Sequence, residues 1–118
     1  MDEDNILLSV KQALGGLTEE YTAFDGQICM FIKGVFDKLD QIGVEPDSDF
    51  SFRPTSKWSQ YLTEGKLLES AKTYMALNVK MLFDPPTNSS VMEAVQEQIR
   101  ELEWRMQVMV ESRKIAAS

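Results

Sequence analysis

Two acidic side chains in the last third of the chain have a spacing that could serve metal chemistry. Glu97 and Glu101 are four residues apart, so on a helix both carboxylates point to the same side. Carboxylate oxygens are ligands that magnesium and calcium prefer. An acidic pair at this spacing is also typical of a solvated helix face. We favour the solvated face and predict no metal site.

The sequence offers few residues that could act in nucleophilic catalysis. The chain has no histidine and a single cysteine, Cys29, which excludes Cys–His pairs, His-based metal sites and zinc clusters. Cys29 lies in the apolar stretch QICMF, where a small buried hydrophobe is favoured over a reactive thiol. Because a lone cysteine forms no internal disulfide, we expect a reducing compartment. No phosphate-binding or hydrolase motif is present, so we expect neither catalysis nor a cofactor.

Composition points to one soluble domain. The chain has 118 residues, of which 43% are hydrophobic and 26% charged, and its net charge is -7. Such a charge argues against broad binding to a nucleic-acid backbone, which needs clustered Lys and Arg. The acidic N-terminus is unlike a secretory signal, and no apolar run approaches the roughly 20 residues of a membrane span. We therefore expect no membrane association.

The elements that must position any site are helical. Apolar residues recur at spacings of three and four, bounded by capping residues and glycines, in four segments: residues 5–14, 23–42, 66–83 and 90–112. The sequence thus predicts an all-α fold, a compact bundle of about four helices. A short extra turn, KWSQYL, and one Pro- and aromatic-containing loop, residues 43–57, complete it. Residues 1–112 form a single domain in this interpretation, with 113–118 a tail that is frayed or ordered by a partner.

Several local details can be predicted as well. Thr22 with Asp25 has the spacing of an N-cap with an acidic N3 residue. Gly34 stands inside a helix, which costs about 1 kcal/mol against Ala, so we expect close approach of another helix there. Ser56 is the expected cap of the short turn. Segment 66–83 is apolar nearly all round, which is typical of a central, buried helix.

Two adjacent prolines separate the last two helices. Each proline disfavours helical geometry in the residue before it, so Pro85 and Pro86 restrict Asp84 and end the helix near Phe83. The stretch TNSS then offers several N-cap candidates, and Ser90 with Glu93 fits a capping box. Asp84, Pro85 and Pro86 are therefore predicted to form a rigid corner within an antiparallel helix pair.

The last helix carries apolar residues on two faces. One stripe, at spacings of three and four, comprises Met92, Val95, Ile99, Leu102, Met106 and Met109. Trp104 and Val108 fall about 140° and 180° from Ile99 at the helical period, among glutamates. Either Trp104 covers a groove within its own domain, or Trp104 and Val108 bind a partner.

The loop aromatics leave a similar choice. Phe50, Phe52 and Trp58 follow one another in the polar segment and the short turn. They either anchor the loop to its own domain or form a contact surface. We retain Phe50, Phe52 and Trp58 with Trp104 and Val108 as the candidate interface.

The block LNVKMLFDPPTNSSVMEAVQEQIRELEWRM resembles the C-terminal half of small head–tail connector proteins of long-tailed bacteriophages and their prophages. The front half, ILLSVKQALGGLTEEYTAFDGQI, with an aromatic loop and a tryptophan after it, is similar to the same group. The resemblance covers about residues 5–108, and LFDPP with ELEWR some twenty residues later is its most specific part.

This resemblance implies a structural adaptor made in the host bacterial cytoplasm and found at the capsid vertex of the virion. Such proteins form a ring, of about twelve copies, in which each copy needs two different contact surfaces. The implied partners are further copies of the chain, the portal protein and a neighbouring head-closure or tail-completion protein. DNA passes through without specific binding. A phage assembly chaperone absent from finished particles, or a small helical regulator, is the alternative.

Overall fold

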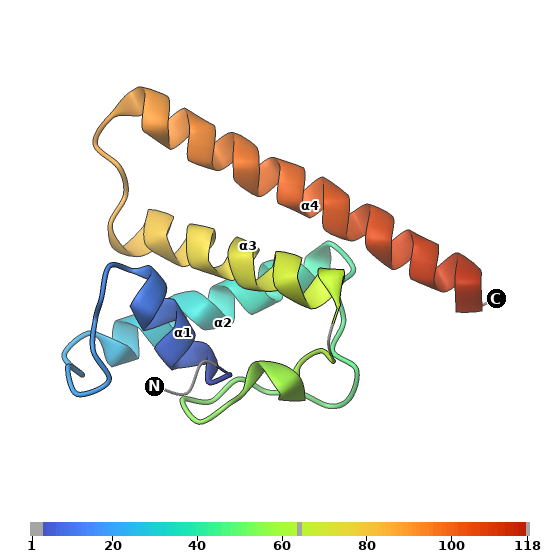
Figure 1. Ribbon diagram of the computed structural model, residues 1–118, viewed down its shortest axis with the longest axis horizontal. Helices are drawn as coiled ribbons and strands as arrows, with labels where there is room; N and C mark the ends of the chain where they lie inside the picture. Colours follow the sequence, from blue (N-terminus) through green and yellow to red (C-terminus); the bar gives the residue numbers. More distant parts are fainter. Residues whose placement is uncertain (1–3, 64, 118) are drawn as a thin grey trace.

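Four α-helices and one short 3-10 helix make up the computed structural model, which describes residues 4–63 and 65–117. The elements in chain order are α1 (Ile6–Ala13), α2 (Asp25–Gln41), η1 (Trp58–Gln60), α3 (Lys66–Phe83) and α4 (Ser89–Ala117). Figure 1 shows α3 between the α1–α2 layer and α4. The predicted all-α bundle with one extra turn and one long loop is confirmed.

Local sequence signals set both ends of α1. The Asn5 side chain accepts a hydrogen bond from the Leu8 amide at 2.9 Å, as an N-cap does. Gly15 and Gly16 have φ values of 102° and 91°, a conformation that ends helices because glycine adopts it freely. Residues 4–6 also pair with the long loop, since the Trp58 amide donates to the Asp4 carbonyl at 2.8 Å.

Helix α2 corrects two details of the sequence analysis. Its N-cap residue is Phe24, with no side-chain cap, and Thr22 contributes only its carbonyl, 3.2 Å from the Asp25 amide. The expected cap by the Thr22 side chain is therefore wrong. Gly34 is exposed, and in the described ranges no atom of another element lies within 4 Å of the place a Cβ would occupy, so none of the described helices approaches it closely. Gly43, with φ 96°, ends the helix as predicted.

The loop between α2 and η1 uses Ser56 differently from expectation. Lys57 is the N-cap residue of η1. The buried Ser56 hydroxyl accepts a hydrogen bond from the Arg53 amide at 2.8 Å. Ser56 therefore closes a turn within the loop instead of capping the 3-10 helix.

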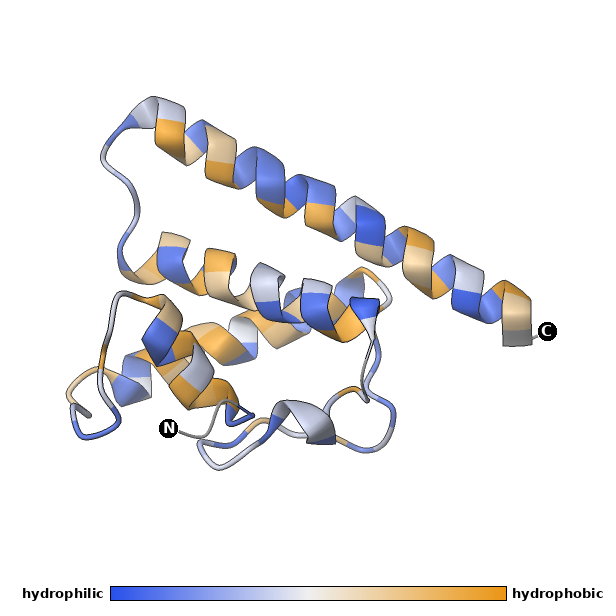
Figure 2. Cartoon of the chain, viewed as in Figure 1, coloured by the Kyte–Doolittle hydropathy of each residue, from blue (hydrophilic) through white to orange (hydrophobic). Residues whose placement is uncertain are grey.

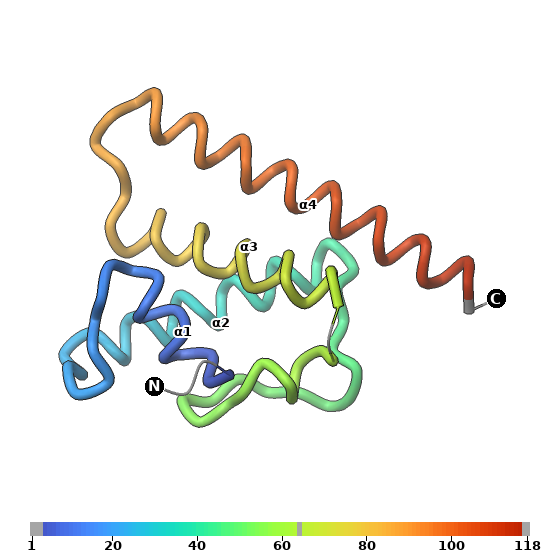
Figure 3. The backbone as a smooth tube through the Cα atoms, in the orientation of Figure 1, coloured from blue at the N-terminus to red at the C-terminus, as the bar shows by residue number. Residues whose placement is uncertain are grey.

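Helix α3 is the central element and has the predicted bounds, 66–83. It contacts each of the other three helices. Its buried residues include Ala71, Tyr74, Met75 and Val79. The last turn departs from the expectation of all-round burial, since Leu82 is about half exposed. This happens because α4 lies away from α3 near the corner and approaches it further along (Figure 3).

The double-proline corner ends α3 where the sequence predicts. Asp84 leaves the helical region with φ -148° and ψ 73°, and the chain reverses direction before α4 (Figure 1). The cap of α4 is Asn88, whose side-chain oxygen accepts from the amides of Ser90 and Val91 at 2.9 and 3.2 Å. Asn88 therefore replaces Ser90 in the capping role that the sequence pattern indicated.

Helix α4 buries only the middle of its apolar stripe. Leu102 and Met106 belong to the core, whereas Met92, Val95, Ile99 and Met109 are half-buried. The helix has 29 residues and reaches Ala117, so the expected helix end at 112 is wrong. Its last turns extend past the bundle (Figure 2). No helix in the described ranges is both long enough and apolar enough to cross a membrane.

Candidate assembly surface

An apolar strip runs along the outer side of α4. Trp104 is 63% exposed, Val108 is also exposed, and Ile115 is 73% exposed. At 100° per residue these three lie about 180° from the buried residue Met106. We call Trp104, Val108 and Ile115 the outer strip. Sequence analysis missed Ile115 because it assigned the residue to a tail, although Ile115 lies eleven residues, about three helical turns, beyond Trp104.

Paired charges border the outer strip. Three ion pairs at spacings of three or four flank it: Glu97–Arg100 at 2.7 Å, Glu101–Arg105, and Glu111–Lys114 at 3.9 Å. Exposed pairs of this kind add little stability. Glu97 and Glu101 therefore each face their own arginine. The border of the strip is polar, with acidic and basic groups in equal number.

A polar link between α3 and α4 fixes which face of α4 points outward. The Tyr74 hydroxyl donates to a Glu103 carboxylate oxygen at 2.6 Å. Burial and then the hydrogen bond to Glu103 raise the pKa of Tyr74 above its usual range, so the phenol stays protonated as a donor. Because Glu103 lies next to Trp104 in the chain, this bond also fixes the direction of the outer strip.

The loop aromatics form an internal cluster. Trp58 is 1% exposed, and its Nε1 donates to the Ser9 hydroxyl at 3.0 Å. The Phe36 ring contacts Phe50, Phe52, Trp58 and Tyr61, with centroids 4.8–6.0 Å apart. Trp58 is therefore a core residue, and we no longer include it in the candidate interface. Phe50 and Phe52 are half-buried on Phe36 and anchor the loop.

The corner residues have a positioning role. Asp84 and Pro85 are exposed and Pro86 is half-buried. The Asp84 amide donates to the Lys80 carbonyl at 2.8 Å and completes the last turn of α3. The corner thus sets the direction in which α4 leaves, and with it the direction of the outer strip.

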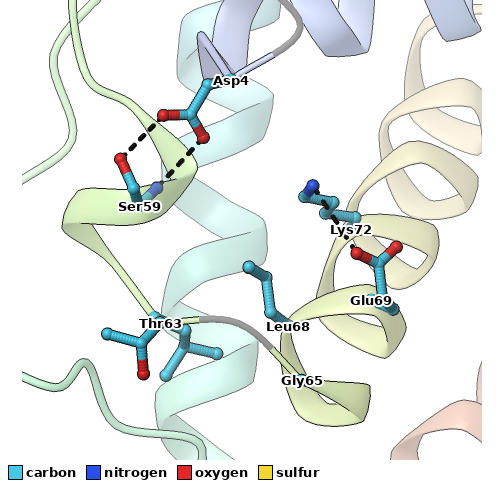
Figure 4. Close-up of a pocket in the computed structure, with 8 residues that line it drawn as sticks. Asp4, Ser59, Thr63, Gly65, Leu68, Glu69 and Lys72 are labelled. Atoms are coloured by element: carbon cyan, nitrogen blue, oxygen red, sulfur yellow. Dashed lines mark hydrogen bonds and ion pairs between the residues drawn. The ribbon is translucent and has the colours of Figure 1, made fainter.

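A hollow of about 650 Å³ lies between η1 and the start of α3 (Figure 4). The Asp4 carboxylate accepts from the Ser59 amide and hydroxyl at 3.2 and 2.7 Å, and Lys72 pairs with Glu69 at 3.8 Å. The Asp4–Ser59 pair and the Glu69–Lys72 pair lie on different sides of the hollow (Figure 4). The hollow is an open surface feature, and the Ser59 hydroxyl and the Lys72 ammonium group on its lining each contact a neighbouring carboxylate.

Two further features bear on chemistry. Burial, and then the charge of Asp25, raise the pKa of the Cys29 thiol, which makes it a weak nucleophile at neutral pH. Among the residues that the structure describes, no three acidic or cysteine side chains converge on a point where a metal ion could sit.

Comparison with known proteins identifies a family for the chain. No curated protein and no solved structure matches the chain. The family model described as phage connector protein matches residues 6–113, which is 108 of the 118 residues and covers α1, α2, α3 and most of α4. Structural proteins of phages make up that family, and on this match the chain belongs to the phage connector protein family.

Proposed function

We propose that this protein is the head–tail adaptor of a bacteriophage or prophage virion. In this proposal copies of the chain form a closed ring, of about twelve, beneath the portal protein at the capsid vertex. The ring joins the capsid to a head-closure or tail-completion protein and leaves a channel for DNA. The membership in the connector family supports this role.

The single observation that carries the proposal is the outer strip. Trp104 is 63% exposed on a helix whose opposite face enters the core. Exposed tryptophans with apolar neighbours are characteristic of interface hot spots, where one residue contributes about 2 kcal/mol or more. The bond between Tyr74 and Glu103 holds this strip outward before any partner binds, which lowers the entropic cost of association.

The charge of the chain suits a DNA channel. A net charge of -7 repels the phosphate backbone on average, so DNA passes without being held. The adaptor is made in the bacterial cytoplasm and acts in the neck of the virion. Because the role is structural, it requires no catalysis and no cofactor.

The test compares Trp104→Ala with Val91→Ala, an exposed apolar residue of the same helix outside the strip. Both variants are introduced into the phage that encodes the chain. We expect both to keep the helical circular-dichroism signal. Trp104→Ala should weaken binding to its virion partner about 30-fold, the equivalent of 2 kcal/mol, and leave filled heads without tails. Normal particles with Trp104→Ala would overturn the assignment of the strip, as would loss of its fold.

A further inference from the structure

A buried lysine holds an exposed segment of the chain in place. Lys11, on α1, is 1% exposed. Its Nζ donates to the Tyr21 carbonyl at 2.8 Å and lies 2.9 Å from an Asp25 carboxylate oxygen. Burying a charge is costly unless it is paired and hydrogen-bonded. The connection between α1 and α2, residues 14–24, is thus tied to α1 at Tyr21 and at Asp25, the first residue of α2.

The segment held in this way presents aromatic rings to solvent. Tyr21 is 49% exposed, and Phe24 is also exposed. The Tyr21 and Phe24 ring centroids are 5.9 Å apart, and Phe24 meets Phe83, the last residue of α3, edge-on at 5.3 Å. We call Tyr21, Phe24 and Phe83 the aromatic corner. Rigid aromatic side chains lose little entropy on binding, which is why they serve as interface anchors.

Acidic residues adjoin the aromatic corner. Glu19 and Glu20 precede Tyr21, and Asp84 follows Phe83, all three exposed. Asp25 is also close but is paired with Lys11. The corner is therefore an apolar knob with a negative border, and its natural complement is an apolar recess with a positive border.

Such a recess lies at the other end of α3. A groove of about 330 Å³ separates the start of α3 from the second half of α4. Its apolar lining consists of Leu62, Leu67, Val108 and Met109. This volume falls within the range of pockets that hold drug-sized molecules, so an aromatic side chain can enter.

The charged residues that line the groove favour an acidic partner. Lys66 and Arg113 are basic and Asp47 is acidic, so the described lining carries a net charge of +1. The Asp47 carboxylate accepts hydrogen bonds from the amide and hydroxyl of Thr63, at 2.7 and 2.9 Å, and lies 3.8 Å from the Arg113 guanidinium. Arg113 and Asp47 therefore offset each other, and Lys66 supplies the net positive charge of the described lining. Groove and corner are separated by the 18 residues of α3, about 27 Å at 1.5 Å per residue. A copy of the chain therefore cannot fill its own groove (Figure 1).

We propose that the aromatic corner of one copy docks into this groove on a second copy. The contact rests on the proposed ring and names the two surfaces that would build it. Because the two surfaces differ and lie at opposite ends of α3, the contact is heterologous, and repetition of it generates a ring when the rotation closes. Val108 then lies at the junction of the groove and the outer strip, which leaves Trp104 for a different partner.

A charge exchange tests the contact. One variant carries Glu19→Lys and Glu20→Lys, the other Lys66→Glu and Arg113→Glu. We expect each alone to lose self-association about tenfold or more, because like charges then meet. An equimolar mixture should regain it, since every junction between unlike variants pairs opposite charges. The control, Asp37→Lys with Asp40→Lys on the exposed side of α2, should associate as the unchanged chain does.

Size-exclusion chromatography with light scattering gives the association, and circular dichroism confirms that each variant is folded. A mixture of folded variants that does not regain association overturns the contact. So does unchanged association of both variants alone.

Photo-crosslinking can detect the contact even when it is too weak to survive size-exclusion chromatography. A benzophenone amino acid replaces Tyr21 in one copy, which is mixed at high concentration with an isotope-labelled unchanged copy. We expect adducts on labelled peptides that contain residues 62–67 or 108–113. Adducts only elsewhere, or none, overturn the contact. If the adducts form but the chain is absent from particles, the proposed function fails and the contact stands.

Discussion

The buried ion pair between Lys11 and Asp25 allows a quantitative prediction. Lys11 is 1% exposed and the Asp25 side chain 27% exposed. Removing one partner of a buried pair costs about 3–5 kcal/mol, because the other charge is left uncompensated. The two partners differ in how much water can reach the remaining charge, and so the two single substitutions should differ in cost.

Lys11→Met leaves a carboxylate that water can still solvate, and we expect it to lower the free energy of unfolding by about 2 kcal/mol. Asp25→Asn leaves an ammonium group in the interior, so its cost should be the larger, about 3–5 kcal/mol. In the double variant no charge remains to be left unpaired. Its cost should be below the sum of the two by about 1–3 kcal/mol.

Urea denaturation at neutral pH, followed by circular dichroism, measures all three variants. The order of the costs is the critical result. If Asp25→Asn proves milder than Lys11→Met, or if both cost less than about 0.5 kcal/mol as surface changes do, the pair is not a buried anchor. Lys11→Met should also weaken self-association, because it frees the Tyr21 segment, whereas Glu19→Lys with Glu20→Lys, at exposed positions, should leave stability within about 0.5 kcal/mol of the unchanged chain.

Three further predictions follow from single contacts. Met106→Asp places an unpaired charge where the side chain is 0% exposed and should unfold the domain. Circular dichroism should then show loss of the helical signal. A cooperative thermal transition like that of the unchanged chain would contradict the direction assigned to α4. Tyr74→Phe leaves Glu103 without its donor and should cost about 1–2 kcal/mol in urea denaturation, and an unchanged midpoint would refute the link. The hydrogen bonds from Thr63 lower the pKa of Asp47 in the folded chain. The stability that this carboxylate contributes is therefore fully present above its unfolded pKa of about 3.9. It is lost as the pH falls through the lower pKa of the folded state. Asp47→Asn should therefore flatten the decline of stability between about pH 4 and 2, and an identical decline in both chains would count against the bond.

Sequence patterns predicted elements that depend on local physics. Gly15, Gly43 and Pro85 end helices through their own backbone preferences, and those ends agree with the structure. The caps at Thr22 and Ser90 were wrong because the backbone or a neighbour took the role: Asn88, two residues upstream of Ser90, accepts from the amides of Ser90 and Val91, so the helix begins before Ser90. Caps of this kind compete within a few residues, and spacing alone does not separate the competitors.

Features that depend on contacts between residues far apart in the chain could not be predicted from sequence patterns. The burial of Trp58 follows from its place in the cluster around Phe36, which no periodicity reveals. By its residue type, Lys11 is predicted to be an exposed polar residue of its helix. Its burial depends on the contact with Asp25, which only the structure shows. The outer strip was partly visible, because Trp104 and Val108 break the polar pattern of α4. Ile115 joins it only when the helix is known to reach Ala117.

Quantitative mass spectrometry of purified particles, from the phage or prophage that encodes this chain, tests the central claim most directly. We expect the chain to be present in finished particles at about the copy number of the portal protein, as a closed ring at the symmetric vertex requires. Absence from mature particles, with presence only during assembly, would contradict the adaptor role and identify an assembly helper instead.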